Sequence, residues 1–231
     1  MLPGARRSLR RLAATAGLRV ALISGRTVAD LAARARIGGV SYRGDHGSER
    51  AEAPRGFRPS ALRAEREEAS PEVVEAAMRL KTGVPAEVNE PWLVLEDKGA
   101  ALTFHFRAAP DVDEAGGRVG AAVDRIDGDH LLERVAYRRS IELRPPGAST
   151  KGHALVALVD ELAPDTVVML GDDRNDALAF DAVRRLRADG RVDGLAIAVA
   201  GHPDVTRDVA PRADLLLASP DETAALLRLL V

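Results

Sequence analysis

The segment VVMLGDDRND, residues 167–176, decides the fold of this 231-residue chain. Its first four residues are apolar without interruption, which is typical of a strand buried on both faces of a sheet. Gly171 ends the apolar run, and a helical pattern follows from about Ala177. Because a buried strand followed directly by a helix is the repeating unit of parallel sheets covered on both faces, we predict an α/β fold around this segment.

The other segments of the chain are of two kinds. Short apolar runs followed by turns or helices predict further parallel strands near both ends of the chain, at 19–23, 40–43, 195–199 and 214–217. Between about Pro59 and Arg144, polar and apolar residues alternate instead, as at 100–106 and 140–144. Such alternation is typical of antiparallel strands with one face in water. We therefore predict that this middle segment is an α+β insert within the α/β fold.

The overall composition excludes several classes of function. With 33 basic and 35 acidic residues the formal net charge is -2, which argues against a nucleic-acid binder driven by phosphate electrostatics. The absence of cysteine excludes disulfides, cysteine-ligated zinc and a thiol nucleophile. No apolar run approaches the roughly 20 residues that span a membrane, and the basic start lacks the apolar centre of a signal peptide. We expect a cytoplasmic protein without nucleic-acid or membrane partners.

Three carboxylates follow the strand at 167–170 within a few residues. Asp172, Asp173 and Asp176 lie on the loop that leaves the carboxyl end of this strand, where open α/β sheets bind their ligands. Clustered oxygen ligands suit Mg²⁺, which proteins bind through one or two carboxylates together with water and phosphate. Helix capping explains one or two acidic residues at a helix start, but three next to Gly171 favour a metal site.

Two further segments are candidates for binding an anion. Ser24-Gly25-Arg26 follows the apolar run at 19–23, and a hydroxyl with free N–H groups at a strand-to-helix turn can cradle an anion. A plain turn with a helix cap explains the same residues. Lys151 precedes a helix predicted at 153–162 and offers a point charge for a phosphate, although a solvated lysine at a helix start is the alternative.

The order of these motifs resembles that of haloacid-dehalogenase phosphatases: a strand ending in serine, a lysine before a helix, and a strand ending in GDDxxD. Five segments extend the resemblance, in order and over nearly the whole chain, to trehalose-6-phosphate phosphatases. They are ALISGR (21–26), GDHGSE (44–49), LEDKGAALTFHFR (95–107), IELRPPGASTKGHAL (141–155) and VVMLGDDRNDALAF (167–180). The resemblance implies a Rossmann-like, parallel-sheet haloacid-dehalogenase core at 1–57 and 145–231, with an inserted α+β cap domain at 58–144.

The resemblance also implies an activity, the Mg²⁺-dependent hydrolysis of trehalose 6-phosphate to trehalose and phosphate. We expect a monomer with a small-molecule sugar phosphate as its partner. A phosphatase of another sugar phosphate, such as sucrose phosphate or mannosyl-phosphoglycerate, is one alternative. A non-catalytic protein that binds a sugar phosphate is another. Asp172 would bind Mg²⁺, with Asp173 and Asp176 as ligands or supports of the ligand. Ser24 and Lys151 would hold the phosphoryl oxygens.

Five more residues receive roles from the resemblance. Arg26 would support the phosphate or the loop on the sugar side, while Glu96 and Lys98 in the cap would hydrogen-bond sugar hydroxyls. His46 and Glu142 are further candidates for the same task. A histidine in a surface loop is the alternative for His46, and a cross-strand ion pair with Arg144 is the alternative for Glu142. We expect a structural role for His105.

One part of the family pattern is missing from the sequence. The family's chemistry begins on its first strand with D-x-D-G-T, whose first aspartate attacks phosphorus and whose second acts as general acid and base. No such segment precedes Ser24. Asp111-Val-Asp113 follows no apolar strand, and Asp127-Gly-Asp129 has the composition of a turn.

A sheet without its first strand would leave the edges of the neighbouring strands unpaired and apolar. We therefore expect the chain as given to be inactive. A recorded start that lies too late, a natural fragment, and a strand supplied by a partner chain are the three explanations, and the first is favoured because a buried central strand is costly to lose.

Overall fold

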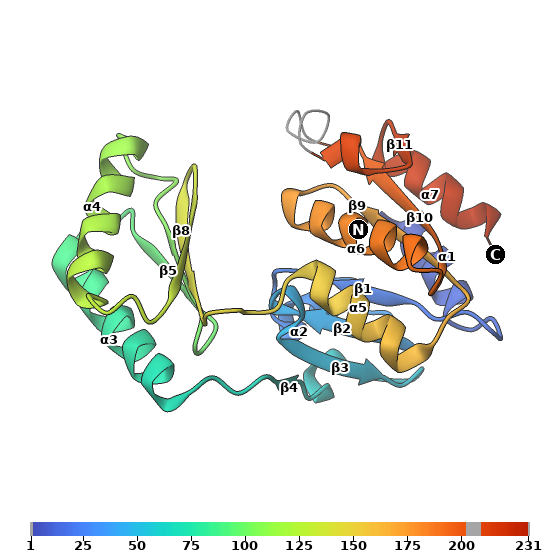
Figure 1. Ribbon diagram of the computed structural model, residues 1–231, viewed down its shortest axis with the longest axis horizontal. Helices are drawn as coiled ribbons and strands as arrows, with labels where there is room; N and C mark the ends of the chain where they lie inside the picture. Colours follow the sequence, from blue (N-terminus) through green and yellow to red (C-terminus); the bar gives the residue numbers. More distant parts are fainter. Residues whose placement is uncertain (1, 202–208, 231) are drawn as a thin grey trace. The chain divides into compact units, whose positions relative to one another are not determined.

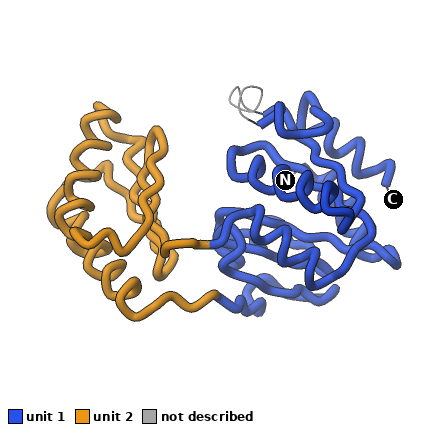
Figure 2. The backbone as a smooth tube through the Cα atoms, in the orientation of Figure 1, with its two compact units in different colours: residues 1–66, 149–231 blue, residues 67–148 orange. Residues whose placement is uncertain are grey.

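The computed structural model describes residues 2–201 and 209–230 (Figure 1). The chain divides into two compact units, residues 1–66 with 149–231 (unit 1) and residues 67–148 (unit 2), as Figure 2 shows. The structure is mixed α/β with a parallel sheet, so the predicted fold class is confirmed. The division into a core and a cap with bounds at 57 and 144 stays a prediction. In the structure, unit 1 extends to residue 66 before unit 2 begins, and not to residue 57. The reason is that a short strand at Glu65–Arg66 pairs within unit 1.

Unit 1 contains two sheets. The first has the order β1-β2-β3-β4, in which β1 and β2 are parallel and the other pairs are antiparallel. The second has the order β11-β10-β9 and is wholly parallel. These strands are β1 (Ala21–Ile23), β2 (Val40–Gly44), β3 (Glu49–Ala53), β4 (Glu65–Arg66), β9 (Thr166–Gly171), β10 (Asp193–Val199) and β11 (Leu215–Leu217).

The helices of unit 1 are α1 (Pro3–Leu12), α2 (Val28–Ala35), α5 (Lys151–Leu162), α6 (Arg174–Ala188) and α7 (Pro220–Leu229), with short 3-10 turns η1 (Asp45–Gly47), η2 (Pro59–Ala61) and η4 (Ala210–Arg212). Helices α5 and α6 pack against each other, and α1 packs against α7 (Figure 1). Gly152 permits the close approach of α5 and α6, because a Cβ there would lie 2.7 Å from the backbone oxygen of Leu178.

Strands β1 and β9 each end a sheet, so each has one edge without a strand partner among the described residues. Ile23 of β1 packs against the apolar cluster that contains Met169 of β9 and Phe180 of α6, so both strands border the same interior. The edge at β9 is apolar, and the side chain of Val168 remains 44% exposed. β1 and β9 thus each have one unpaired edge among the described residues, and the loss of a strand between them stays a prediction.

A second apolar cluster fixes the sheet of β1 to β4. It surrounds Tyr42, which is fully buried and donates its hydroxyl to the backbone oxygen of Ile37 at 2.7 Å. Arg43, its neighbour on β2, is also buried and forms ion pairs with Glu52 and Glu161, each at 2.8 Å. Because Glu161 belongs to α5, this arginine connects the first sheet to the helices that pack on the second.

Unit 2 is an antiparallel sheet with two helices packed together. Its elements are α3 (Pro71–Val88), β5 (Val94–Asp97), β6 (Leu102–His105), α4 (Val112–Ile126), β7 (Glu133–Tyr137) and β8 (Ser140–Arg144), with the strand order β5-β6-β8-β7. Leu102 and Phe104 of β6 are buried in one cluster with Leu80 of α3 and Val119 of α4. This is the α+β architecture that the alternating pattern predicted for the insert.

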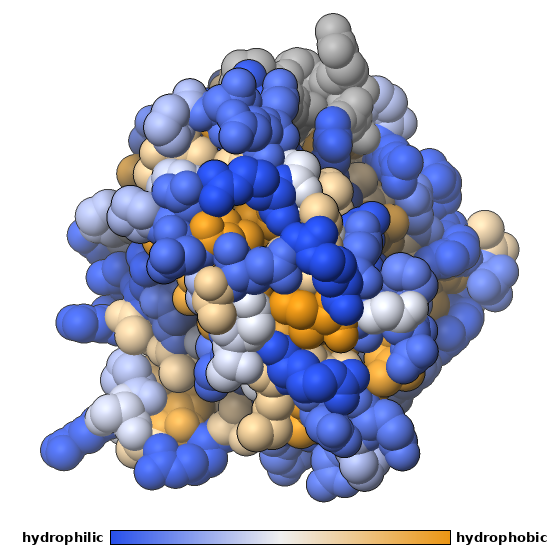
Figure 3. Space-filling view, turned by 90° about the vertical axis from the view of Figure 1, so that its left-hand side faces the viewer, coloured by the Kyte–Doolittle hydropathy of each residue, from blue (hydrophilic) through white to orange (hydrophobic). Residues whose placement is uncertain are grey.

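Figure 3 shows one face of the molecule, on which hydrophilic residues predominate and apolar ones lie between them. Apolar side chains that α3 leaves exposed include Val74 and Met78. Of the described helices, none is both long and apolar enough to span a membrane.

Candidate active site

The acidic loop between β9 and α6 brings its three carboxylates together. One oxygen from each of Asp172, Asp173 and Asp176 can be chosen so that all three lie within 4.8 Å of one another. Asp173 caps α6 by accepting from the backbone N–H of Asp176, and Asp176 accepts in turn from the N–H groups of Asp172 and Asp173 at 2.9 and 3.0 Å. The capping interpretation is therefore correct for Asp173 and Asp176, and Asp172 is left as the exposed carboxylate without a part in the cap.

Gly171 makes this arrangement possible. A Cβ at this position would lie 2.3 Å from the side-chain carbons of Asp176, which folds back over the end of β9. Only a residue without a side chain lets the Asp176 carboxylate reach the N–H groups of the loop. The glycine that ends the apolar run is thus part of the construction of the acidic loop.

Lys151 binds directly to this loop. Its ammonium group donates to Asp176 at 2.8 Å and to Asp173 at 2.9 Å, and the residue is only 5% exposed. The alternative of a solvated lysine at a helix start is therefore wrong. Thr150 caps α5 by accepting from the N–H of His153, so the helix begins at Lys151 and not at residue 153.

The pKa values of the cluster reflect its balance of charges. Burial alone lowers the pKa of Lys151, but the carboxylates of Asp176 and Asp173 outweigh burial and raise it above its ordinary value. Burial raises the pKa of Asp173, yet the attraction of Lys151 prevails and lowers it. For Asp176, burial and the neighbouring Asp173 carboxylate prevail over Lys151, and the pKa is raised.

Ser24 lies in the turn at the carboxyl end of β1. Its hydroxyl accepts from the N–H of Arg26 at 3.2 Å, and its backbone oxygen accepts from the N–H of His46 at 2.9 Å. A Cβ on Gly25 would lie 2.7 Å from the His46 ring, so His46 of η1 packs directly over this turn. His46 has a φ of 59°, and its ring is half-buried.

The η1 turn connects this serine to the start of α5. A Cβ on Gly47 would lie 2.6 Å from the hydroxyl oxygen of Ser149 and 2.7 Å from the Cβ of Ala154. These two residues flank Lys151 in the sequence. The structure therefore joins Ser24, His46 and the Lys151 helix start by successive close contacts within unit 1.

The side chain of Arg26 is bound to helix α2. Its guanidinium group forms an ion pair with Asp30 in the first turn of α2 at 3.0 Å, and its side chain is 55% exposed. In this arrangement Arg26 braces α2, and a role in supporting phosphate stays a prediction.

Of the candidates for the sugar, His46 lies in unit 1, whereas Glu96, Lys98 and Glu142 lie in unit 2. The candidates in unit 2 form a row across the sheet. Glu96 of β5 is paired with Thr103 of β6, and Thr103 is paired with Glu142 of β8. Lys98 and Glu142 are both buried, with 3.7 Å between the Lys98 nitrogen and the nearer Glu142 oxygen. An ion pair between Glu142 and Arg144 is not what the structure contains, because Arg144 pairs with Glu133 at 3.5 Å.

Sequence reasoning missed two members of this polar row, Thr103 and Tyr137. The Tyr137 hydroxyl donates to Glu142 at 3.2 Å, and the Thr103 hydroxyl is buried without a hydrogen-bond partner among the described residues. His105 contacts Glu96 at 3.0 Å between its Nε2 atom and a carboxylate oxygen. The alternation around 100–106 placed Thr103 and His105 on one face, but the strand register was needed to show which carboxylates they meet.

Both D-x-D segments have structural roles in unit 2. Asp111 caps α4 by accepting from the N–H groups of Asp113 and Glu114. Asp127 accepts from the N–H groups of Leu131 and Leu132 after α4, at 3.1 Å each. Neither pair lies on a strand.

Comparison with known proteins shows which family the chain resembles. The trehalose-phosphatase family model matches residues 1–216. A trehalose-phosphate phosphatase of Mycobacterium tuberculosis is 35% identical over 193 residues, which are 79% of this chain and 46% of that protein. One from Mycolicibacterium paratuberculosis is 37% identical over 216 residues, which are 90% of this chain and 51% of that protein. The chain thus spans about half the length of these curated relatives.

Solved structures resemble it over its whole length. A trehalose-6-phosphate phosphatase of Aspergillus fumigatus superposes with a TM-score of 0.62 at 22% identity, covering 99% of this chain and 83% of that one. The C-terminal domain of the Candida albicans trehalose-6-phosphate phosphatase gives 0.66 at 22% identity, with 100% and 86% covered. A haloacid dehalogenase-like hydrolase from Bacteroides thetaiotaomicron gives 0.60 at 17% identity, with 98% and 91% covered.

Proposed function

Because the chain belongs to the trehalose-phosphatase family and has the haloacid-dehalogenase fold that its sequence predicts, we propose a function on this premise. The chain contributes to the Mg²⁺-dependent hydrolysis of trehalose 6-phosphate to trehalose and phosphate. The observation that carries the proposal is the acidic loop with Lys151 buried against it. The loop gathers three carboxylates, of which Asp173 and Asp176 bind the one ammonium group, so acidic groups outnumber basic ones for a cation to offset. All three acids are oxygen donors, the ligand type that Mg²⁺ prefers.

Each residue of unit 1 has a distinct task in this proposal. Asp172, which is exposed and takes no part in the helix cap, would hold Mg²⁺, and Asp173 and Asp176 would orient the loop through the bonds described above. The metal would neutralise charge on the phosphoryl group. The ammonium of Lys151 lies at the edge of the same loop, where a partial shift from Asp173 would let it donate to a phosphoryl oxygen. The Ser24 hydroxyl would donate to another, while its oxygen accepts from Arg26 as it does now.

The attack on phosphorus needs a further carboxylate. Because Asp111 and Asp127 both serve as caps in unit 2, neither is available as the nucleophile of unit 1. We propose that the 231 residues alone bind substrate without turnover, and that hydrolysis needs a strand bearing D-x-D-G-T along the unpaired edges of β1 and β9. Binding without turnover is thus the second candidate function.

The sugar would be held by unit 2, through Glu96, Lys98 and Glu142. Carboxylate and ammonium groups in a row present the acceptors and donors that a polyol requires. The choice of trehalose 6-phosphate over sucrose phosphate or mannosyl-phosphoglycerate stays a prediction, as does the action of a cytoplasmic monomer on this small molecule.

The metal assignment can be tested by calorimetric titration of the chain with Mg²⁺. We expect one saturable site, which the Asp172→Ala variant loses. Asp165→Ala is the matched control, because Asp165 is an exposed aspartate just before β9. Equal binding by wild type and Asp172→Ala would overturn the assignment of Asp172.

Turnover can be tested by adding a synthetic peptide that contains an apolar strand followed by D-x-D-G-T. We expect no phosphate release from the chain alone, and release with the peptide that is faster for trehalose 6-phosphate than for sucrose phosphate or mannosyl-phosphoglycerate. A peptide with asparagine at the first aspartate is the matched control. Release by the purified chain without any peptide would contradict the proposed need for the strand.

A further inference from the structure

The two faces of the sheet in unit 2 differ in chemistry. Leu102 and Phe104 of β6 belong to the apolar core that the sheet forms with α3 and α4. Because successive side chains of a strand point to opposite faces, Thr103 between them points away from this core. Thr103 is paired with Glu96 on one neighbouring strand and with Glu142 on the other, so the polar row lies on the face opposite to the helices.

Thr103 has a shorter side chain than the two glutamates beside it. It lies on the middle strand of three, and neighbouring strands are about 4.8 Å apart, so the backbones of Glu96 and Glu142 are roughly 10 Å apart across it. The polar row thus has a hydroxyl group in the middle and a longer acceptor on each side. Sugars carry hydroxyl groups on adjacent carbons, and such a row offers each of them a partner.

The Thr103 hydroxyl is buried without a hydrogen bond. The residue is 6% exposed, and its hydroxyl oxygen has no hydrogen-bond partner among the described residues. A buried hydroxyl in this state is destabilising, and a valine would fill the same space of the strand without that cost. The carboxylates on both sides are contacted by other side chains, Glu142 by the Tyr137 hydroxyl at 3.2 Å and Glu96 by the His105 Nε2 at 3.0 Å.

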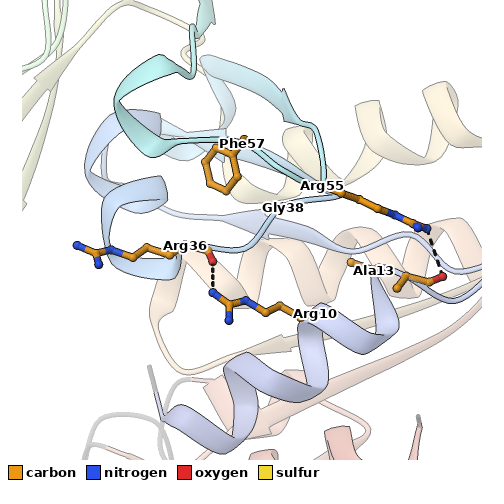
Figure 4. A pocket seen from close by; sticks show the side chains of 7 residues that line it. Arg10, Ala13, Arg36, Gly38, Arg55 and Phe57 are labelled. Carbon is orange, nitrogen blue, oxygen red and sulfur yellow. Dashed lines mark hydrogen bonds between the residues drawn. The ribbon is translucent and has the colours of Figure 1, made fainter.

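A cavity in unit 1 offers a contrast (Figure 4). Arg10, Arg36 and Arg55 line it, but each of them donates to a backbone oxygen. Arg10 binds the oxygen of Arg36 at 2.7 Å, and Arg55 binds that of Ala14 at 3.3 Å, so these side chains hold the ends of α1 and α2. Their contacts account for their positions, whereas no contact within the described chain accounts for the Thr103 hydroxyl.

We propose that Thr103 is a specificity-determining residue of the sugar site, whose hydroxyl hydrogen-bonds to a sugar hydroxyl held between Glu96 and Glu142. The inference rests on the proposed function, in which unit 2 holds the sugar. A sugar hydroxyl both donates and accepts, so it can donate to a carboxylate while it accepts from Thr103. The Lys98 nitrogen is 3.7 Å from Glu142, longer than a hydrogen bond, and Lys98 turns from Glu142 to the sugar as the ligand reaches Thr103.

This role explains why a threonine without a partner is kept at this position. A site built to hydrogen-bond a substrate hydroxyl rejects ligands that lack it, because its own buried polar group is then left unpaired. The cost of the Thr103 hydroxyl in the free chain is thus offset in the complex with the correct sugar.

The test is calorimetric titration of the full chain with trehalose 6-phosphate in Mg²⁺. We expect Thr103→Val to weaken binding about five- to tenfold, because it removes one hydrogen bond and keeps the shape of the side chain. Thr103→Ser keeps the hydroxyl, and we expect its affinity within about threefold of wild type. Thr82→Val is the matched control, since Thr82 is an exposed threonine of α3 that bonds only within its own helix.

Melting curves separate binding from folding. We expect Thr103→Val to melt at or above the wild-type temperature, because it removes a buried hydroxyl that has no partner in the free chain. A lower melting temperature together with weaker binding would assign Thr103 to the fold and overturn the inference.

The outcomes also separate this inference from the proposed function. Wild-type affinity in Thr103→Val, with affinity lost in Glu96→Gln, would mean that unit 2 holds the sugar without Thr103, and only the inference would fall. Equal losses in Thr103→Val and Thr103→Ser would show that the hydroxyl is not the binding group. If the wild-type chain does not bind trehalose 6-phosphate, the proposed function and the inference both fail.

Discussion

At the scale of single residues, the site depends on partners that are distant in the sequence. Lys151 and Asp176 are 25 positions apart, yet their contact at 2.8 Å determines the charge and the burial of both. No local pattern shows such a contact. From the sequence alone, a solvated lysine at a helix start therefore explained Lys151 as well as a phosphate-binding lysine did. The resemblance of the motifs did indicate which residues belong together. For Glu142, the sequence suggested an ion pair with its neighbour Arg144. In the structure Glu142 pairs with Lys98 instead, and Arg144 pairs with Glu133.

Replacing Lys151 with Met would leave the buried Asp176 carboxylate and the half-exposed Asp173 carboxylate without their counterion. Removing one partner of a buried ion pair costs about 3–5 kcal/mol, and we expect a loss near the lower figure because the Asp173 side chain is 52% exposed. The free energy of unfolding from urea titration measures it. Lys81→Met is the control, since Lys81 forms only an exposed pair with Asp97, worth at most about 1 kcal/mol. An equal loss in both variants would contradict the role given to Lys151.

At the scale of elements, the strands and helices were predictable because each one has a local signal. The continuous apolar run at 167–170 is β9, and alternation at 140–144 is β8. Helix starts were less accurate. Helix α6 begins at Arg174 and not near Ala177, because the acidic residues that suggested a metal site also cap the helix. Strand register, which brings Thr103 between Glu96 and Glu142, has no local signal and required the structure.

The first turn of α2 allows a pH prediction. Burial alone raises the pKa of Asp30, but hydrogen bonds from Arg34 and Arg26 outweigh it and lower the pKa below its ordinary value. The stabilisation from these bonds is therefore present above the ordinary pKa and is lost as the pH falls through the lowered one. We expect a carbon-detected NMR titration to show the lowered pKa, and Arg34→Gln to raise it toward normal. An unchanged pKa in Arg34→Gln would contradict this, and Arg50→Gln, remote from Asp30, is the control.

At the scale of the whole molecule, the family resemblance predicted the fold, whereas the strand that D-x-D-G-T would occupy stays a prediction. Local patterns could show that β1 and β9 are strands, but not which strands neighbour them. The structure shows two sheets that share an interior through Ile23 and Met169, while each ends at an unpaired edge. The cavity lined by Arg10, Arg36 and Arg55 could not be predicted, because its three arginines come from segments with no common motif.

The unpaired edges of β1 and β9 predict that backbone amides exchange at different rates in different strands of unit 1. Strand β10 has a partner on both sides, whereas β9 and β1 have one each among the described residues. An amide exchanges sooner where a smaller part of the structure must unfold to expose it. We therefore expect the backbone N–H groups of β10 to be the best protected in unit 1. Those of β1 and β9 should exchange well before them. Strand β6, which lies between β5 and β8 in unit 2, is the internal control for a doubly paired strand. Equal protection of β9 and β10 would mean that the β9 edge is paired in solution. Slower exchange in β1 and β9 after addition of the D-x-D-G-T peptide, with β6 unchanged, would show that these edges receive the added strand.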